Sequence, residues 1–303
     1  MSEEAPIRSA RGAFVDRVGE LAELAAGLED ARGGRGRLFL VTGEPGIGKT
    51  RLADEVAAQA VSSAMTVLRA GCWEGGGTPA YWPFVQVLRA ALSGAEREAR
   101  LKLLSAGNAP HVALDLAQLI PELQSSAAAP ADASIQTAPN PEQARFRLFD
   151  SVAAAIRSLA AQRPLMLILE DLHDADQPTL LMLRFVVGQL KNAPVLILGT
   201  YRDFEVQRSP ALSQPVGDLT REGTQVPLCA LSREDAARMI EERAGAPSNP
   251  RLVADIYQAT AGNPLFIDGL VRVLAADGSL SNASRLNLAV FRVPDGVREA
   301  IRR

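Results

Sequence analysis

The sequence is poor in cysteine and has no long apolar run. Its 303 residues include only two cysteines, Cys72 and Cys229, which lie far apart in the chain. Two distant cysteines exclude a disulfide framework and the paired spacing of a zinc-binding motif. Because both lie among apolar residues, we expect two buried free thiols.

A membrane segment is also missing from the sequence pattern. No run reaches the ~18 apolar residues that a transmembrane helix needs. Residues 1–17 mix acidic residues with arginines and contain no apolar stretch of signal-peptide length. We therefore expect a cytoplasmic protein with no membrane partner.

Positive charge is not in excess. The chain has 32 basic and 35 acidic residues, for a formal net charge of −3. A nucleic-acid-binding domain typically gathers basic residues on one face, so we expect no direct contact with nucleic acid. The length and an apolar fraction of 47% are sufficient for about two globular domains.

The most informative stretch that is present is an apolar strand followed by a glycine-rich loop and a helix. The strand, residues 38–41, leads into a G-x-x-x-x-G-K-T motif, and residues 51–60 have helical spacing. This order is the context that a phosphate-binding P-loop requires. The motif predicts a nucleotide-binding loop made of Gly43, Glu44, Pro45, Gly46, Ile47, Gly48, Lys49 and Thr50.

The residue types in this loop have a chemical reason. Glycines allow the backbone to turn several N–H groups inward, a shape that most residues with a Cβ avoid. The helix that begins near Lys49 directs its free N–H groups and positive dipole end to the same place. We expect Lys49 to bind the β- and γ-phosphates and the Thr50 hydroxyl to bind Mg²⁺. The chain is therefore predicted to bind a nucleoside triphosphate.

A second apolar strand ends in two acids. Residues 164–169 are apolar and are followed by Glu170 and Asp171, the Walker B pattern. We expect Glu170 to hold Mg²⁺ and Asp171 to orient the attacking water, with strand alternation sending the two side chains in different directions. The pair alone would equally suit a helix cap, but the upstream P-loop favours catalysis. His173 is left open, as a site residue or as a polar group at a helix start.

A third apolar strand, residues 193–200, carries polar residues at its end. Ligands of open α/β sheets bind at the carboxyl ends of strands. We therefore expect Thr200 and Arg202 to sense the γ-phosphate, with Arg202 stabilising the transferred charge as a catalytic residue. The alternative is an ordinary surface pair of Arg202 with Asp203.

The remaining pattern gives the domain organisation. We expect a disordered leader at 1–13, a P-loop nucleotide-binding domain at 14–231 and a helical lid at 232–276. Within the core, we expect a short strand at 225–231 to close the sheet, and the Ala/Pro/Ser-rich composition of 125–141 predicts a disordered loop. We also expect helices over 19–31, 85–104 and 142–161, a solvated basic turn over 32–37 and a loop-like segment over 277–292. The chain then ends in an amphipathic segment, which suggests a fragment of a longer protein.

The ordered set of motifs resembles the bacterial STAND ATPases, signal-transduction ATPases with numerous domains, of the branch found in large ATP-binding LuxR-family regulators. The resemblance covers residues 14–303. It rests on Phe14-Val15-x-Arg17, Gly-Glu-Pro-Gly-Ile-Gly-Lys-Thr, Ala80-Tyr81-Trp82-Pro83, Leu169-Glu170-Asp171-Leu172-His173, Gly199-Thr200-Tyr201-Arg202-Asp203 and Gly262-Asn263-Pro264-Leu265-Phe266.

The resemblance implies an α/β fold, an AAA-like P-loop NTPase core with a central parallel sheet plus a small C-terminal α-helical lid. A fourth strand would lie between the P-loop strand and the Walker B strand. Adenine would be held between the segment that ends at Arg17 and the region of Pro264. Hydrolysis of ATP to ADP would be slow and would return the protein from its active to its inactive state. A winged-helix domain normally follows, so 277–303 would be a linker and the truncated start of that domain.

Three departures from the family pattern stand out. The family usually has Gly-Arg-Glu where this chain has Asp16-Arg17-Val18, and a Trp where this chain has Asp174. The second change adds a negative charge near the metal. No second clear arginine finger is visible, and Arg221 is better explained as a surface residue.

Together these features favour an ATP-binding module whose nucleotide state controls self-association and an output domain. Two alternatives stay open. A P-loop small-molecule kinase would need an acceptor pocket, and a non-hydrolysing nucleotide-binding scaffold would not need the Glu170–Asp171 pair.

Overall fold

The computed structural model describes residues 17–73, 79–93, 110–123, 140–245 and 247–276. The chain divides into two compact units. The sheet unit comprises Val18–Glu44 and Leu52–Pro227. The lid unit comprises Arg17, Pro45–Arg51 and the described residues from Leu228 onward. Each unit is described by itself below.

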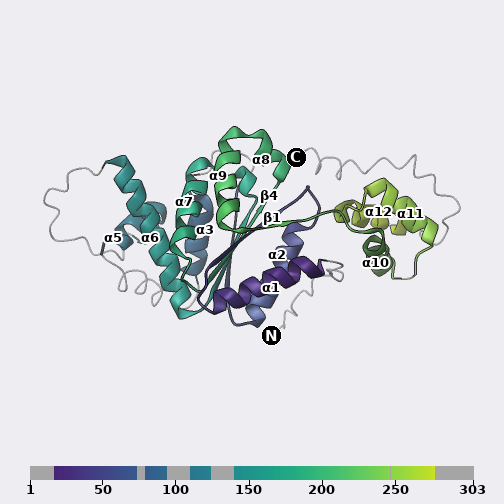
Figure 1. Ribbon diagram of the computed structural model, residues 1–303, viewed down its shortest axis with the longest axis horizontal. Helices are drawn as coiled ribbons and strands as arrows, with labels where there is room; N and C mark the ends of the chain where they lie inside the picture. The colour runs from purple at the N-terminus through teal and green to yellow at the C-terminus, as the bar shows by residue number, and fades with distance from the viewer. Residues whose placement is uncertain (1–16, 74–78, 94–109, 124–139, 246, 277–303) are drawn as a thin grey trace, which may run out of the picture. The chain divides into compact units, whose positions relative to one another are not determined.

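The sheet unit is built on five parallel strands (Figure 1). Their order in the sheet is β2-β3-β4-β1-β5, so β4 lies between β1 and β3, as the family resemblance implied. The strands are β1 Arg37–Thr42, β2 Thr66–Gly71, β3 Leu165–Glu170, β4 Val195–Tyr201 and β5 Thr224–Pro227. The predicted α/β fold with a P-loop NTPase sheet is thus confirmed.

The last strand is shorter than expected. It pairs with β1 and ends at Pro227, whereas the sequence predicted a strand over 225–231. Proline has no N–H group with which to extend a ladder, so it suits the end of an edge strand. The residues from 228 to 232 have no regular secondary structure and lead into the helices of the lid unit.

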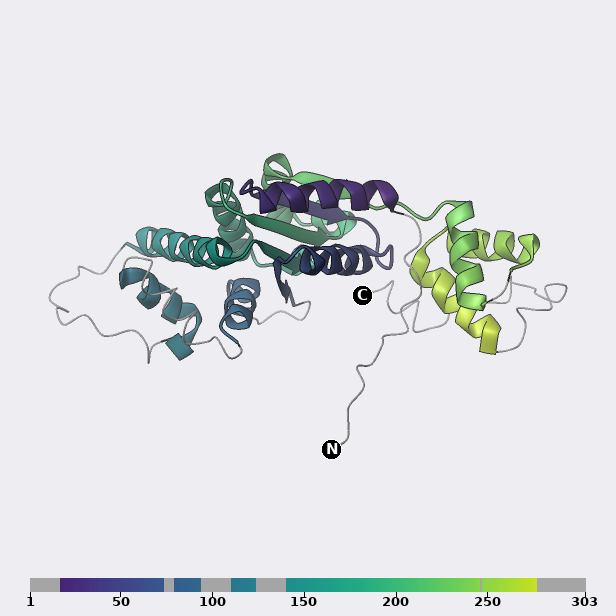
Figure 2. The same cartoon turned by 90° about the horizontal axis from the view of Figure 1, so that it is seen from below.

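Helices cover both faces of the sheet, because buried parallel strands need apolar partners on each side. Two helices, α1 and α2, lie on one face of the sheet (Figure 2): Gly27 of α1 approaches Phe39 and Leu196, and residues of both helices line one shared hollow. On the opposite face, strand residues such as Leu38, Leu40 and Leu167 pack with the later helices of the sheet unit. The helices of this part of the chain are α1 Val18–Arg32, α2 Lys49–Ser62, α3 Trp82–Ala91, α5 Pro110–Leu119, α6 Pro141–Gln162, α7 Gln177–Gln189, α8 Asp203–Arg208 and α9 Pro210–Glu222, with short 3₁₀ turns η1 Pro121–Leu123 and η2 Leu172–Asp174.

Two expected boundaries change. The helix predicted over 85–104 begins earlier, at Trp82, and its described part ends at Ala91, while 94–104 lie outside the described residues. Most of the predicted loop 125–141 also lies outside them, but Pro141 is the first residue of α6. The Asn140 side chain caps that helix by accepting from the Glu142 N–H at 3.2 Å.

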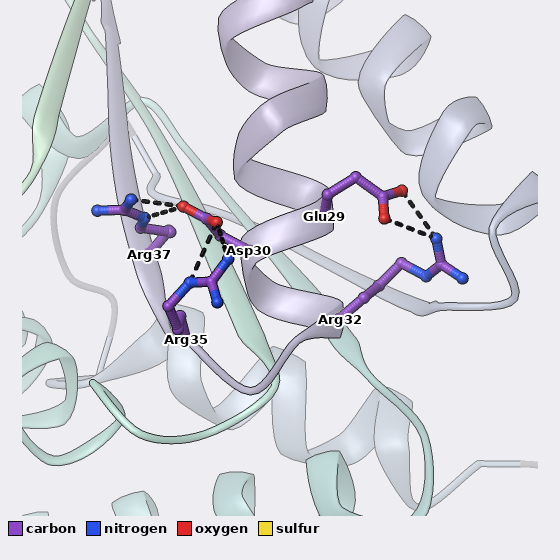
Figure 3. A network of polar contacts seen from close by, with 5 residues as sticks. All are labelled: Glu29, Asp30, Arg32, Arg35 and Arg37. Carbon is purple, nitrogen blue, oxygen red and sulfur yellow. Dashed lines mark hydrogen bonds and ion pairs between the residues drawn. The ribbon is translucent and has the colours of Figure 1, made fainter.

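The basic turn before β1 is tied to the end of α1 (Figure 3). Arg35 and Arg37 both donate to the carboxylate of Asp30, the latter through Nε at 2.7 Å. Arg32 makes a separate exposed pair with Glu29 at 2.7 Å. Hydrogen bonds first from Arg35 and then from Arg37 lower the pKa of Asp30 below its ordinary value. Two arginines of this turn, Arg35 and Arg37, therefore neutralise the negative charge of Asp30 near the end of α1.

The cysteines differ from the prediction. Cys72 is half-buried, and burial together with nearby carboxylates raises the pKa of its thiol to about 12. Cys229 is exposed rather than buried, because it lies in the connection after β5, outside both apolar cores.

The lid unit has three helices and an apolar core of its own. The helices are α10 Arg233–Ala244, α11 Pro250–Thr260 and α12 Pro264–Ala276. Ser232 caps α10 by accepting from the Asp235 N–H at 3.1 Å. The core consists of Leu231, Ala236, Ile240, Leu252, Val253, Ile256, Ile267, Leu270, Val271 and Leu274. Among the described residues, none of the helices in either unit has the length and apolarity to span a membrane.

Candidate nucleotide site

The P-loop starts where β1 ends and leads directly into α2. All three glycines of the loop have positive φ angles, with 150° at Gly43, 75° at Gly46 and 104° at Gly48. Only glycine adopts such conformations readily, so these positions require it. Lys49, the first residue of α2, is buried, and Thr50 is exposed. The backbone therefore has the curled form that binds an anion through N–H groups.

The lid unit holds this loop by its carbonyl groups. Asn263 Nδ2 donates to the Pro45 carbonyl at 3.0 Å, and the Leu265 N–H donates to the Gly46 carbonyl at 3.3 Å. A Cβ added at Gly46 would lie 2.7 Å from the Leu265 Cβ, so the close approach itself requires glycine. Contacts to carbonyl oxygens fix the loop without competing with a phosphate for its N–H groups.

Arg17 adds a third contact of the same kind. Its buried guanidinium donates to the Ile47 carbonyl at 3.4 Å and to the Cys229 carbonyl. Arg17 therefore connects the P-loop with the chain that leaves β5. Its φ of 78° is unusual for a residue with a Cβ. Of the segment expected to contact adenine, Phe14 lies outside the described residues, and the half-buried Pro264 is the first residue of α12.

Asn263 is the functional residue that the sequence reasoning missed. The motif was noted for Pro264, yet the buried Asn263 makes the contact to the P-loop. Its Oδ1 also accepts from the Leu265 N–H at 3.1 Å, which caps α12. The available signal was an Asn directly before a Pro at a helix start, the pattern of an N-cap followed by a proline.

Glu170 ends β3 and lies beside β2. Its Oε2 is 3.6 Å from Nη1 of Arg69, whose other terminal nitrogen binds Asp54 at 2.6 Å. The Glu170 carboxylate is thus oriented by a cation from the neighbouring strand. Its side chain is 17% exposed, so one side of the carboxylate is accessible.

Asp171 does not continue the strand. Its φ of 57° and ψ of 49° are left-handed, so the expectation that strand alternation separates the two acids was wrong. The turn separates them instead. The Asp171 N–H donates to Thr200 Oγ1 at 3.0 Å, and the Asp171 side chain is 47% exposed. The buried Thr200 thus uses its oxygen to hold the Asp171 backbone.

Arg202 is engaged by a neighbour on its own helix. It lies at the N-cap of α8, and its Nη1 contacts Glu205 Oε1 at 2.7 Å. It pairs with Glu205, whereas the carboxylate of the adjacent Asp203, which the sequence alternative named, accepts from Gln207 at 2.9 Å. His173 lies in η2 with a fully buried side chain, next to Asp174 and Glu205.

Comparison with known families agrees with this geometry. The sequence profile described as "AAA ATPase domain" matches residues 13–198, which is more than half of the chain. The chain belongs to the AAA ATPase domain family. No curated protein matches the sequence closely enough to count as a relative.

Solved structures similar to this AAA ATPase domain share its fold at low identity. Cdc6p from Pyrobaculum aerophilum is 11% identical at a TM-score of 0.50, with 88% of this chain and 65% of that chain covered. AMPPCP-bound DnaA from Aquifex aeolicus is 14% identical at 0.50, with 90% and 66% covered. A STAND protein with a tetratricopeptide repeat sensor from Pyrococcus horikoshii is 18% identical at 0.45, with 88% and 32% covered. The chain thus spans less than two thirds of these structures.

The residues of the AAA ATPase domain fit a nucleotide with Mg²⁺. The positive φ angles at the three glycines and a buried lysine at the first position of α2 suit a polyphosphate. The Thr50 hydroxyl and the Glu170 carboxylate each offer an oxygen atom as a metal ligand, the ligand type that Mg²⁺ prefers.

Proposed function

We propose that this AAA ATPase domain is an ATP-binding, slowly hydrolysing switch of a multidomain regulator, with the nucleotide state controlling self-association. The observation that carries the proposal is the direct attachment of the lid to the P-loop. Asn263, Leu265 and Arg17 engage three successive P-loop carbonyls, those of Pro45, Gly46 and Ile47. A change in the loop on phosphate binding or release is thereby passed to the lid.

The site residues take the following roles in this proposal. Lys49 and the loop N–H groups bind the phosphates, which fix the nucleotide in place. Thr50 and Glu170 hold Mg²⁺, which would neutralise charge on the β- and γ-phosphates. Asp171 orients the attacking water. Arg202 counters the charge that develops on the γ-phosphate, which requires it to leave Glu205.

Adenine is the proposed base. The support is the family resemblance, which puts adenine near Arg17 and Pro264, and the likeness to DnaA, whose structure contains AMPPCP. The resemblance to LuxR-family regulators supports a role in transcription through a separate output domain. The net charge of −3 supports no direct contact of this chain with nucleic acid.

A switch requires that ATP and ADP prefer different conformations of the lid. A ligand shifts an equilibrium only by its difference in affinity for the two states. The γ-phosphate is the group that differs between the two nucleotides. The P-loop and the lid lie in one compact unit, so a γ-phosphate-dependent change at the loop would be felt by the lid.

The test combines nucleotide binding, turnover and molecular size. We expect Lys49→Ala to lose nucleotide binding, and Asp171→Asn to bind ATP but hydrolyse it at least tenfold more slowly. We expect the wild-type protein to form larger assemblies in ATP than in ADP, measured by light scattering after size-exclusion chromatography.

Other results would identify the alternatives. Turnover that depends on an added small-molecule acceptor would indicate a kinase. Unchanged size with ATP bound but not hydrolysed would indicate a scaffold. Binding that survives Lys49→Ala at full strength would contradict the P-loop assignment.

A further inference from the structure

We propose that His173, Asp174 and Glu205 form a binding site for a transition-metal dication of the zinc type, separate from the Mg²⁺ ligands proposed above. The three residues offer one nitrogen and two carboxylate oxygens within 4.8 Å of one another. All three belong to the sheet unit, on η2 and α8.

The distances fit tetrahedral coordination. Nε2 of His173 is 3.5 Å from Oδ2 of Asp174 and 3.4 Å from Oε2 of Glu205. Metal–ligand bonds of 2.0–2.1 Å at tetrahedral angles place neighbouring ligand atoms about 3.4 Å apart. An ion can therefore occupy the space between these atoms with little movement of the protein, and water would supply the fourth ligand.

Neighbouring groups leave one atom of each of two ligands directed into the site. Glu205 uses Oε1 to accept from Arg202 at 2.7 Å, which leaves Oε2 directed to His173. The other ring nitrogen of His173, Nδ1, lies 4.0 Å from a carboxylate oxygen of Asp171. This distance is too long for a hydrogen bond, and it is the buried Nε2 that faces the carboxylates of both Asp174 and Glu205.

Burial and charge favour a cation at this position. The His173 side chain is 0% exposed, whereas those of Asp174 and Glu205 are 20% and 37% exposed, so an ion would enter from the carboxylate side. Asp171, Asp174 and Glu205 bring three negative charges against one positive charge from Arg202. The imidazole ligand selects Zn²⁺, Co²⁺ or Ni²⁺ over Mg²⁺, which prefers oxygen atoms alone.

The first experiment titrates Zn²⁺ into the metal-free full chain without nucleotide and with millimolar Mg²⁺ present, in competition with a chromogenic chelator. We expect one site that Mg²⁺ does not displace. Asp174→Asn and Glu205→Gln should each weaken Zn²⁺ binding at least tenfold. Asp203→Asn is the matched control, because Asp203 lies on the same helix as Glu205 and its carboxylate accepts from Gln207 at 2.9 Å instead.

A spectroscopic readout identifies the ligands directly. The chain has only two histidines, so ¹⁵N-histidine NMR resolves the ring nitrogens, and His173→Gln assigns them. Zn²⁺ should shift the His173 Nε2 resonance. Co²⁺ should give a tetrahedral visible spectrum without a thiolate band, since the proposed ligands are one imidazole and two carboxylates and include no cysteine.

The proposal is wrong if Zn²⁺ binds the Asp174→Asn and Glu205→Gln variants as tightly as Asp203→Asn, or if saturating Zn²⁺ leaves the His173 ring resonances unchanged. Circular dichroism of metal-free variants checks folding. If Asp174→Asn does not fold, the more exposed Glu205→Gln decides the outcome.

Discussion

At the scale of single residues, Thr200 fixes the backbone of Asp171. Its buried hydroxyl oxygen is the acceptor for the Asp171 N–H at 3.0 Å, at the point where the chain turns left-handed. We predict that Thr200→Val, which keeps the shape but removes this acceptor, lowers the free energy of unfolding by about 1–3 kcal/mol. ATP turnover should fall more than ATP affinity, because Asp171 loses its position.

Urea unfolding and steady-state turnover measure the two effects. Thr200→Ser is the control, since it retains the hydroxyl and should keep most of both properties. Equal turnover in Thr200→Val and the wild type would show that Asp171 does not depend on this hydrogen bond.

Asp30 gives a pH-dependent prediction at the same scale. Arg35 and then Arg37 lower its pKa in the folded protein, so the folded state binds fewer protons than the unfolded state near the ordinary pKa. Stability from this carboxylate is therefore fully present above the unfolded pKa of about 3.9 and is lost as pH falls through the lowered folded pKa.

The comparison uses Asp30→Asn and urea unfolding from pH 7 to pH 3. We expect the difference in the free energy of unfolding between wild type and Asp30→Asn to be constant down to about pH 5 and to shrink as the pH falls from there to 3. Arg35→Gln should raise the pKa of Asp30, as read from its carboxyl ¹³C titration. An Asp30 pKa at or above the ordinary value would contradict the geometry.

At the scale of elements, α1 and β1 approach closely at a glycine. A Cβ on Gly27 would lie 2.2 Å from Phe39 Cε2 and 3.3 Å from Leu196 Cδ1. Alanine normally stabilises a helix relative to glycine, but here we expect Gly27→Ala to lower the free energy of unfolding by about 1–3 kcal/mol through overpacking.

The matched variant is Gly217→Ala in α9, where nothing lies within 4 Å of the added Cβ. We expect this change to raise the free energy of unfolding by about 0.5–1 kcal/mol, because alanine loses less backbone entropy on folding. Denaturant unfolding of both variants checks the sign. An increase in the free energy of unfolding in both variants would mean that helix propensity outweighs the contact with Phe39.

The segment between α11 and α12 allows a second element-scale prediction. Asn263→Asp keeps the oxygen that caps α12 and removes the Nδ2 donor to the Pro45 carbonyl. A negative carboxylate would then face a carbonyl, so we expect ATP affinity to fall about 5- to 100-fold, a loss of roughly 1–3 kcal/mol. The α12 helix itself should remain.

Asn249→Asp is the control for this substitution. Asn249 caps α11 by accepting from the Arg251 N–H at 2.9 Å, so its substitution tests the same amide-to-acid change at another helix cap of the lid unit. Calorimetry should show unchanged ATP affinity for Asn249→Asp. If Asn263→Asp also binds ATP normally, the lid does not support the loop through this contact.

At the scale of the whole molecule, nucleotide binding should appear as stability. A ligand at a hundredfold excess over its Kd stabilises the folded state by about 2.7 kcal/mol. We expect ATP with Mg²⁺ to raise the Tm of the wild type and to leave that of Lys49→Ala unchanged. Lys191→Ala, which removes an exposed lysine far along the chain, should respond like the wild type. A full ATP-dependent shift in Lys49→Ala would place the nucleotide elsewhere.

The sequence alone was sufficient for three strands of the sheet and for the P-loop glycines. Apolar runs that end in glycines or acids predicted β1, β3 and β4, because buried parallel strands are continuous in apolar residues and ligands bind at their carboxyl ends. The three P-loop glycines were also readable, since their backbone angles exclude most other residues.

Only the tertiary structure decided which groups meet. The contacts of Asn263 with Pro45 and of Arg17 with Cys229 join residues more than 200 positions apart, and no local pattern encodes such a pairing. The left-handed turn at Asp171 depends on Thr200 from another strand. Strand and P-loop patterns follow from local backbone chemistry, whereas partners of polar side chains follow from packing, which the order of residues does not state.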